Sequence, residues 1–251
     1  MALQEEMEKQ GIWLFKYRGT IPLIILVIGA VLLVLKEIYP ETYFLQNSSL
    51  EIYYEMFCLF VSLIGLGIRV YTVGHTPVNT SGRNTAEQIA DTLNTTGIYS
   101  IVRHPLYLGN FFMWAGPALL TGNLWFVVSF CFFYWIYYER IMFAEEQFLR
   151  RKFGDIYDKW SETVASFIPF SFRYIPSKLT FSVKNVLKRE YNSFVNIFVI
   201  FTLMDLCRNY FLSERIYLSE MWIYISASAF LIWIVVRTIH KRTTWLEVEG
   251  R

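Results

Sequence analysis

Six stretches of this chain are long, apolar and nearly free of charge, and this feature constrains the fold more than any other. A helix that crosses the hydrocarbon core of a bilayer needs about 20 such residues. Charged residues make up only 18% of the 251 residues, against about 25% in an average soluble domain. The sequence therefore predicts an all-α, polytopic membrane helix bundle of about six transmembrane helices and excludes an ordinary soluble domain. The stretches cover residues 20–35, 52–73, 105–121, 124–142, 194–210 and 217–238.

The third and fourth stretches are separated by only Gly122 and Asn123. Two residues suffice to connect a pair of antiparallel helices. The sequence thus predicts a tight helical hairpin, which returns the end of the fourth stretch to the start of the third.

Lysine and arginine residues fall almost entirely on one side of this topology. With the N-terminus placed in the cytoplasm, all but three of the 23 lie in cytoplasmic segments, and the exceptions are Lys36, Arg208 and Arg215. Cytoplasmic segments of membrane proteins carry such an excess. We therefore expect a multi-pass integral membrane protein with both termini in the cytoplasm. The net charge of +2 leaves no broad basic field, so no nucleic acid partner is expected.

Two of the intervening segments are too long and polar to be simple connections. Residues 74–102 are rich in Thr, Asn, Ser and Gly, and loops of this length are often functional. Residues 150–190 carry aromatic and aliphatic side chains at mostly helical spacing among charged ones. Such a pattern predicts an interfacial segment with its aromatic side chains in the headgroup layer. Those side chains are Phe153, Tyr157, Trp160, Val164 and Phe167.

The first candidate site is the segment Gly-Ile-Tyr-Ser-Ile-Val-Arg-His-Pro-Leu-Tyr-Leu-Gly at residues 97–109. Pro105 suits the first turn of a helix, where its missing N–H would be unpaired anyway. A helix start favours anions, so Arg103, His104 and Tyr107 are candidates for an anion-binding mouth. The same residues also suit an interfacial anchor with no ligand.

A second candidate element, at the end of the fourth stretch, carries Glu139, Glu145 and Glu146. Taken alone it fits a solvated helix end with an ion pair between Glu146 and Arg150, which contributes only about 0.3–0.5 kcal/mol. The predicted hairpin, however, brings these carboxylates beside the histidine-bearing helix start. A ligand that carries both a cation and an anion, such as S-adenosyl-L-methionine (SAM), would suit that cleft.

At these residues the chain resembles the membrane methyltransferase superfamily of isoprenylcysteine carboxyl methyltransferases and phospholipid N-methyltransferases. The family pattern reads Gly-x-Tyr-x-x-x-Arg-His-Pro-x-Tyr-x-Gly, then Glu-Glu-x-x-Leu, then Phe-Gly-x-x-Tyr-x-x-Tyr and a closing Phe-Ile-Pro. These elements fall here at residues 97–109, 145–149, 153–160 and 167–169, with Trp160 in place of the second Tyr.

The resemblance implies an enzyme that binds SAM at the cytoplasmic face. It also implies a methyltransferase core at residues 92–176, between N-terminal helices at 1–91 and a two-helix extension at 177–251 that extends beyond the family core. The implied cofactor contacts are Tyr99, His104, Tyr107, Glu145 and Glu146.

SAM carries an activated methyl group, so the protein mainly has to align an acceptor with it. We expect a lipid or lipid-linked acceptor. An oxyanion acceptor, phosphate or carboxylate, needs no base and would be held by Arg103 or Arg140. An amine acceptor needs a general base, for which Glu139 or Glu145 is the nearest candidate. The basic residues favour an oxyanion slightly.

Two other classes of protein remain open at this point. Sterol reductases resemble part of the same region and use NADPH. A membrane scaffold or transporter would draw on Asp205 and Arg208, because charges inside a membrane often mark a pathway. The three cysteines lie in apolar runs without metal-ligand spacing, so no metal site is expected.

Overall fold

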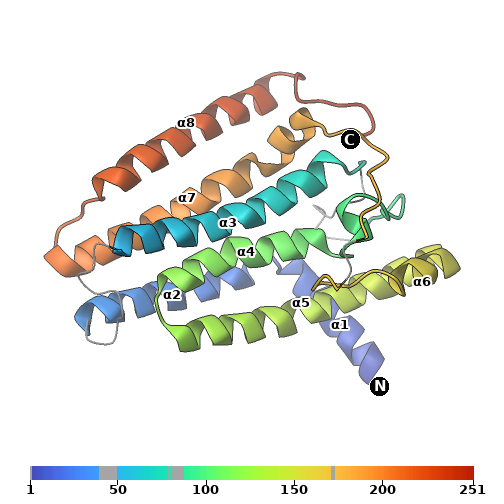
Figure 1. Ribbon diagram of the computed structural model, residues 1–251, viewed down its shortest axis with the longest axis horizontal. Helices are drawn as coiled ribbons and strands as arrows, with labels where there is room; N and C mark the ends of the chain where they lie inside the picture. The colour runs from blue at the N-terminus through green and yellow to red at the C-terminus, as the bar shows by residue number, and fades with distance from the viewer. Residues whose placement is uncertain (1, 40–49, 79, 81–87, 171–172) are drawn as a thin grey trace.

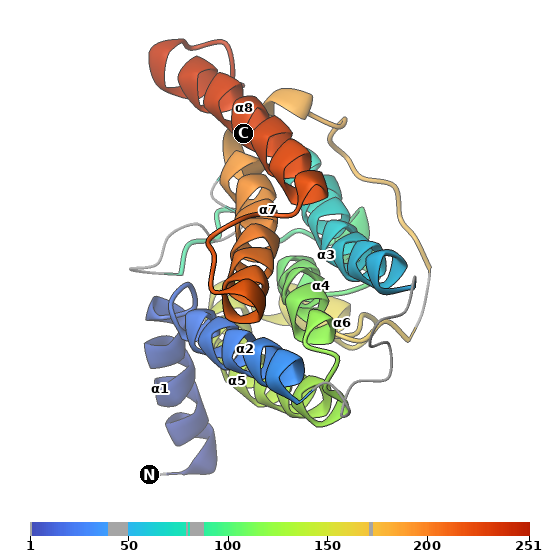
Figure 2. The ribbon, with the colours of Figure 1, turned by 90° about the vertical axis from the view of Figure 1, so that its left-hand side faces the viewer.

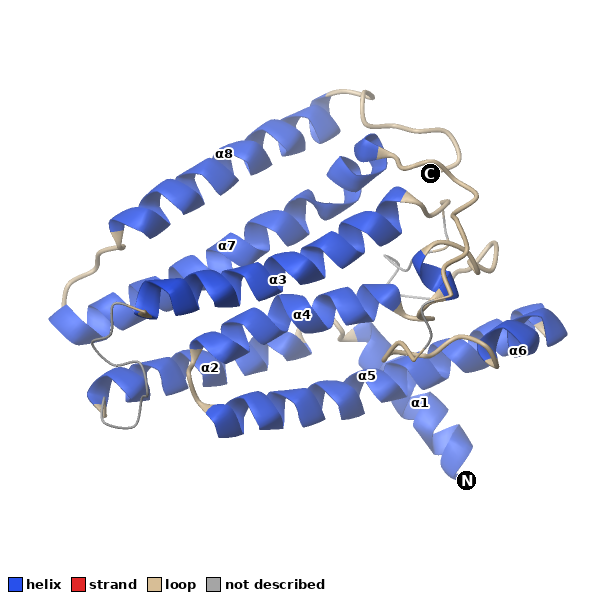
Figure 3. Ribbon diagram, in the orientation of Figure 1, coloured by secondary structure: helices blue, strands red, loops and turns tan. Residues whose placement is uncertain are grey.

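The computed structural model describes residues 2–39, 50–78, 80, 88–170 and 173–251. Over these residues the chain is helical and contains no β-strand, only two isolated β-bridges (Figure 3). The all-α prediction is therefore confirmed. The helices are α1 (Leu3–Lys16), α2 (Ile21–Ile38), α3 (Glu51–Gly74), α4 (Pro105–Leu120), α5 (Leu124–Phe153), α6 (Asp155–Ser161), α7 (Val183–Ser213) and α8 (Glu220–Arg242).

The six predicted apolar stretches coincide with α2, α3, α4, α5, α7 and α8. Within the described residues, four helices are long and apolar enough to cross a membrane, namely α3, α5, α7 and α8. Helix α2 adds the shorter apolar stretch Leu23–Lys36, and α4 is 16 residues long. The chain is thus a membrane helix bundle. Its count of six spans stays a prediction.

The long helices lie side by side along one direction (Figure 1). Helix α7 contacts α2, α3, α4 and α8, and Figure 2 shows α8 on the outside of the bundle against α7. Helix α4 ends at Leu120 and α5 begins at Leu124, where the Asn123 side chain accepts a hydrogen bond from the Phe126 N–H at 2.9 Å. This short connection places the start of α4 and the end of α5 at the same end of the bundle (Figure 1).

Small residues allow α3 and α4 to pack closely. A Cβ atom added to Gly65 would collide with the backbone oxygen of Gly109, and one added to Gly116 would collide with Cys58 and Ser62. Small residues at helix contacts are typical of membrane bundles, where van der Waals packing drives association. This packing fixes α4, which carries the candidate site.

The prediction of one interfacial segment over residues 150–190 is wrong. Helix α5 continues to Phe153, α7 already begins at Val183, and the residues between them fold back against the bundle. Tyr157, Val164 and Phe167 are buried within the protein. Helical spacing of aromatic residues identifies a helix face that is buried away from water. It does not show whether that face packs against lipid or against protein.

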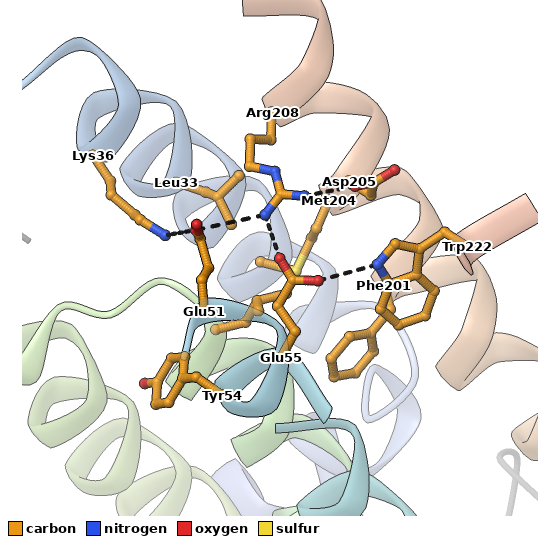
Figure 4. A pocket seen from close by; sticks show the side chains of 11 residues that line it. Leu33, Lys36, Glu51, Tyr54, Glu55, Phe201, Met204, Asp205, Arg208 and Trp222 are labelled. Atoms are coloured by element: carbon orange, nitrogen blue, oxygen red, sulfur yellow. Dashed lines mark hydrogen bonds and ion pairs between the residues drawn. The ribbon is translucent and has the colours of Figure 1, made fainter. Parts of the chain in front are cut away.

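A network of charged side chains links the end of α2, the start of α3 and the later part of α7 (Figure 4). Arg208 forms ion pairs with Glu55 and Asp205, the latter at 2.8 Å, and also approaches Glu51 at 3.7 Å. Lys36 pairs with Glu51 at 3.3 Å. Two of the three basic residues predicted to lie away from the cytoplasm are thus neutralised by carboxylates of α3 and α7.

Candidate functional site

The segment before α4 is held by backbone hydrogen bonds to the chain that follows α6. Gly97 adopts φ +64°, a conformation that favours glycine, and its N–H donates to the Ile175 carbonyl at 2.8 Å. The N–H groups of Arg103 and His104 donate to the carbonyls of Ala165 and Ser166, at 2.8 and 3.1 Å. Residues far apart in sequence therefore fix the start of α4.

His104 lies between the two carboxylates of α5. Its Nε2 is 3.0 Å from Glu146 Oε1, and its Nδ1 is 3.4 Å from Glu145 Oε2. Arg103 Nη1 donates to Glu146 Oε2 at 3.1 Å, and the Tyr107 hydroxyl donates to Glu145 Oε1 at 2.6 Å. The structure thus places the Arg-His-Pro-x-Tyr element beside the Glu-Glu element.

The two carboxylates favour the charged form of His104. Burial alone would lower the pKa of this imidazole, but the hydrogen bonds with Glu145 and Glu146 outweigh burial and raise the pKa above its ordinary value. A protonated His104 donates from both ring nitrogens and, together with Arg103, balances the two negative charges.

A surrounding layer of aromatic residues supports these side chains. The Tyr134 hydroxyl donates to the Tyr107 carbonyl at 2.7 Å, and Trp160 Nε1 donates to the Tyr99 carbonyl at 3.2 Å. Arg103 Nη1 also donates to the Tyr157 hydroxyl at 3.4 Å. Tyr157 and Trp160 therefore hold the site in place, and neither lines the cavity beside it.

That cavity has a volume of about 610 Å³, within the range of about 300–1,000 Å³ that is usual for small-molecule sites. Its walls come from the α1–α2 junction, α3, the loop before α4, the start of α4, the end of α5 and the start of α7. Of the sequence-predicted residues, the structure places Tyr99, Arg103, His104, Tyr107 and Glu145 in its lining.

Three predicted site residues lie outside this lining. Glu146 lies behind it, bonded to Arg103 and His104. Glu139 and Arg140 do not line the cavity, and the backbone oxygen of Arg140 lies against Gly11 of α1. The catalytic roles suggested for Glu139 and Arg140 stay predictions.

The structure also adds residues that the sequence analysis missed. Arg69 binds Glu190 through two hydrogen bonds, at 2.9 and 2.8 Å, and donates to Asn110 at 2.7 Å, and all three residues line the cavity. A lone arginine within the apolar stretch 52–73 was the available signal, because such charges usually face a partner or a cavity. Lys188, Arg189 and Arg251 also line the cavity.

No group of three or more potential metal ligands occurs among the residues that the structure describes. The cavity instead combines carboxylate, imidazole, hydroxyl and guanidinium groups from several helices and the loop before α4. Such a lining is suited to an organic ligand that carries both charges.

Comparison with known proteins identifies the same region. Residues 52–156 match the family model described as phospholipid methyltransferase. This region contains α3, α4, α5 and the carboxylate–histidine cluster. It begins at residue 52, well before the core expected at residues 92–176, so the domain division stays a prediction.

Curated relatives carry related names. The chain is 41% identical over 78 residues to the protein-S-isoprenylcysteine O-methyltransferase of Schizosaccharomyces pombe, covering 31% of this chain and 33% of the relative. It is 32% identical over 120 residues to a probable protein-S-isoprenylcysteine O-methyltransferase of Oryza sativa subsp. indica, covering 44% and 62%. The Saccharomyces cerevisiae enzyme of this name is 36% identical over 104 residues, covering 41% and 42%.

The chain therefore spans between one third and two thirds of the length of these relatives. No solved structure matches it. The predicted resemblance to the membrane methyltransferase superfamily is confirmed.

Proposed function

We propose that this chain, whose residues 52–156 match the phospholipid methyltransferase family, is a SAM-dependent membrane methyltransferase that acts on a lipid or lipid-linked acceptor. The observation that carries the proposal is the cluster in which His104 bridges Glu145 and Glu146 at the wall of a ligand-sized cavity. A SAM-dependent methyltransferase accounts for the family match better than an NADPH-dependent reductase or a transporter does.

The residues present fit SAM. Glu145 offers carboxylate oxygens at the cavity wall to a cationic group, while Arg103 and the start of α4 favour a carboxylate. The Nε atom of Arg103 is buried and has no hydrogen-bond partner among the described residues, so a donor remains available at the site. SAM, when bound, supplies an activated methyl group on a sulfonium.

The protein's own contribution is to orient the two reactants and to exclude water. Tyr107 and His104 fix the Glu145 carboxylate from two directions, which holds its position without a bound ligand. Proximity and orientation of this kind supply about 7–11 kcal/mol of a reaction barrier. An oxyanion acceptor needs no base here, whereas an amine acceptor would transfer a proton to Glu145.

Asp205 and Arg208, the evidence for a transporter, have structural partners. Asp205 accepts hydrogen bonds from Arg208 and from the N–H and hydroxyl groups of Ser219, at 2.8, 2.9 and 2.7 Å. Both charges therefore belong to the network that ties α3, α7 and α8 together.

The cofactor assignment is tested by calorimetric titration of the purified chain in detergent with SAM. We expect His104→Ala and Glu145→Gln each to weaken SAM binding about tenfold or more, because each removes a charged group at the cavity wall. Glu139→Gln is the matched control, since it neutralises a carboxylate of the same helix outside the cavity. Binding of NADPH in place of SAM, or unchanged SAM affinity in both site variants, would contradict the assignment.

A further inference from the structure

The cavity has a second wall whose chemistry differs from that of the carboxylate–histidine cluster. This wall is the first part of α7 together with Arg251, and its cationic side chains are Lys188, Arg189 and Arg251. The two acidic residues in the described part of the lining are paired with other residues of the lining: Glu190 with Arg69, and Glu145 with His104 and Tyr107. The α7 wall is therefore positively charged.

The α7 wall is held rigidly in place. Asn185 is 1% exposed, and its Nδ2 donates to the Val73 carbonyl at 2.8 Å. Glu190, five residues further along α7, is fixed by the two hydrogen bonds from Arg69. Arg251 Nη1 donates to the Gly74 carbonyl at 3.1 Å. These contacts fix the backbone on either side of Lys188 and Arg189.

The lining also contains buried donors that have no acceptor. Arg103 Nε and Gln88 Nε2 are the buried side-chain nitrogens without a hydrogen-bond partner within the described part of the chain, and both residues line this cavity. Buried N–H groups are nearly always paired in folded proteins. Arg103 belongs to the cofactor cluster, whereas an acceptor oxygen of a second ligand would satisfy Gln88 Nε2.

The position of the α7 wall indicates the source of such a ligand. Lys188 and Arg189 lie in the first two turns of α7, which continues as the candidate membrane span Val183–Phe211. Basic residues at the end of a span lie at the level of the lipid headgroups and attract anionic lipids. A phosphate or carboxylate on a lipid therefore matches both the charge and the depth of this wall.

We infer that α7 and Arg251 form an acceptor subsite, in which Lys188 and Arg251 bind the anionic headgroup of the lipid substrate. The inference rests on the proposed function only in calling the bound lipid a substrate. The binding of an anionic lipid can be measured independently of any methyltransferase activity. It gives the helices outside the family match a direct part in the site.

The test is a binding titration of the purified chain, followed by intrinsic tryptophan fluorescence. The probes are dihexanoyl phosphatidate, the zwitterionic dihexanoyl phosphatidylcholine and inorganic phosphate. We expect phosphatidate to bind more tightly than either control ligand. Lys188→Ala and Arg251→Ala should each weaken phosphatidate binding about tenfold, because each removes a charge-assisted hydrogen bond.

Lys241→Ala is the matched control, because it removes one positive charge from the exposed end of α8, outside the cavity lining. It should bind phosphatidate as the unmodified chain does. Equal phosphatidate affinity in all three variants, or no binding to the unmodified chain, would overturn the subsite. Inorganic phosphate binding as tightly as phosphatidate would overturn the assignment to a lipid.

A parallel SAM titration separates this inference from the proposed function. Phosphatidate binding without SAM binding would contradict the proposed function and leave the anionic subsite standing. SAM binding without phosphatidate binding would contradict the subsite alone. Melting curves of the variants show whether any loss of binding is a loss of fold.

Discussion

His104 connects the chemistry of the site to pH, because it sits between two carboxylates in a buried position. Sequence spacing places His104 and Tyr107 on one helix face, and the predicted hairpin brings carboxylates beside them, but neither shows which carboxylate pairs with which group. The partners depend on how far α5 continues past residue 142, and the structure shows that it continues to Phe153. The residue types of the site were therefore predictable, whereas the pairing of each nitrogen with one carboxylate was not.

The first prediction concerns this histidine. Because its folded pKa is raised above the ordinary value of 6.5, protonated His104 stabilises the folded protein fully below pH about 6.5. This contribution is lost as the pH rises through the raised pKa. We expect the Tm advantage of the unmodified chain over His104→Gln to be largest at acidic pH and to shrink toward alkaline pH.

The measurement is thermal unfolding in detergent across about pH 5.5 to 9. His75→Gln serves as the control, because no acidic side chain among the described residues pairs with His75. A Tm advantage that grows with pH would contradict the assigned charge state of His104.

At the scale of whole elements, the apolar runs predicted six of the eight α-helices within the described residues. The ends of the long helices are harder to predict, because charged residues inside a helix resemble the end of a membrane span. Lys184, Lys188 and Arg189 belong to α7 itself. The same residues were counted only as topology signals, and so the α7 wall of the cavity was missed.

The second prediction concerns the packing of α3 on α4. Gly65→Val should lower the free energy of unfolding by about 1–3 kcal/mol, because overpacking forces the two backbones apart. It should also weaken SAM binding, since Gly109 lies two residues from Tyr107 on the displaced helix.

Gly67→Val is the matched control on the same helix, because a Cβ atom at Gly67 meets nothing within 4 Å. Equal melting temperatures and SAM affinities in the two variants would show that the close approach of α3 and α4 does not matter. Detergent melting and calorimetry provide both measurements.

At the scale of the whole molecule, the two ends of the bundle differ in charge and in role. The starts of α4 and α7 and the end of α5, which carry the carboxylate–histidine cluster and the α7 wall, lie at one end (Figure 1), while Lys36 and Arg208 are paired with carboxylates near the end of α2, the start of α3 and the end of α7 (Figure 4). A cavity lined by several basic residues at one end, and basic residues paired with carboxylates at the other, favour the orientation that the positive-inside rule predicts. We therefore place the cavity on the cytoplasmic side as a prediction.

The last prediction tests this orientation with single cysteines introduced into a chain whose three native cysteines are replaced. Thr92 and Thr163 are exposed and belong to segments joined by the hydrogen bond from Trp160 to Tyr99. Cysteines at both positions should therefore react with an impermeant maleimide from the cytoplasmic side only. A cysteine at Arg215, exposed beyond the end of α7, should react from the opposite side only. Reaction of the cysteines at Thr92 and Thr163 from opposite sides would contradict the fold itself. Reversed labelling at all three positions would contradict only the orientation. It would then move the proposed SAM site away from the cytosol.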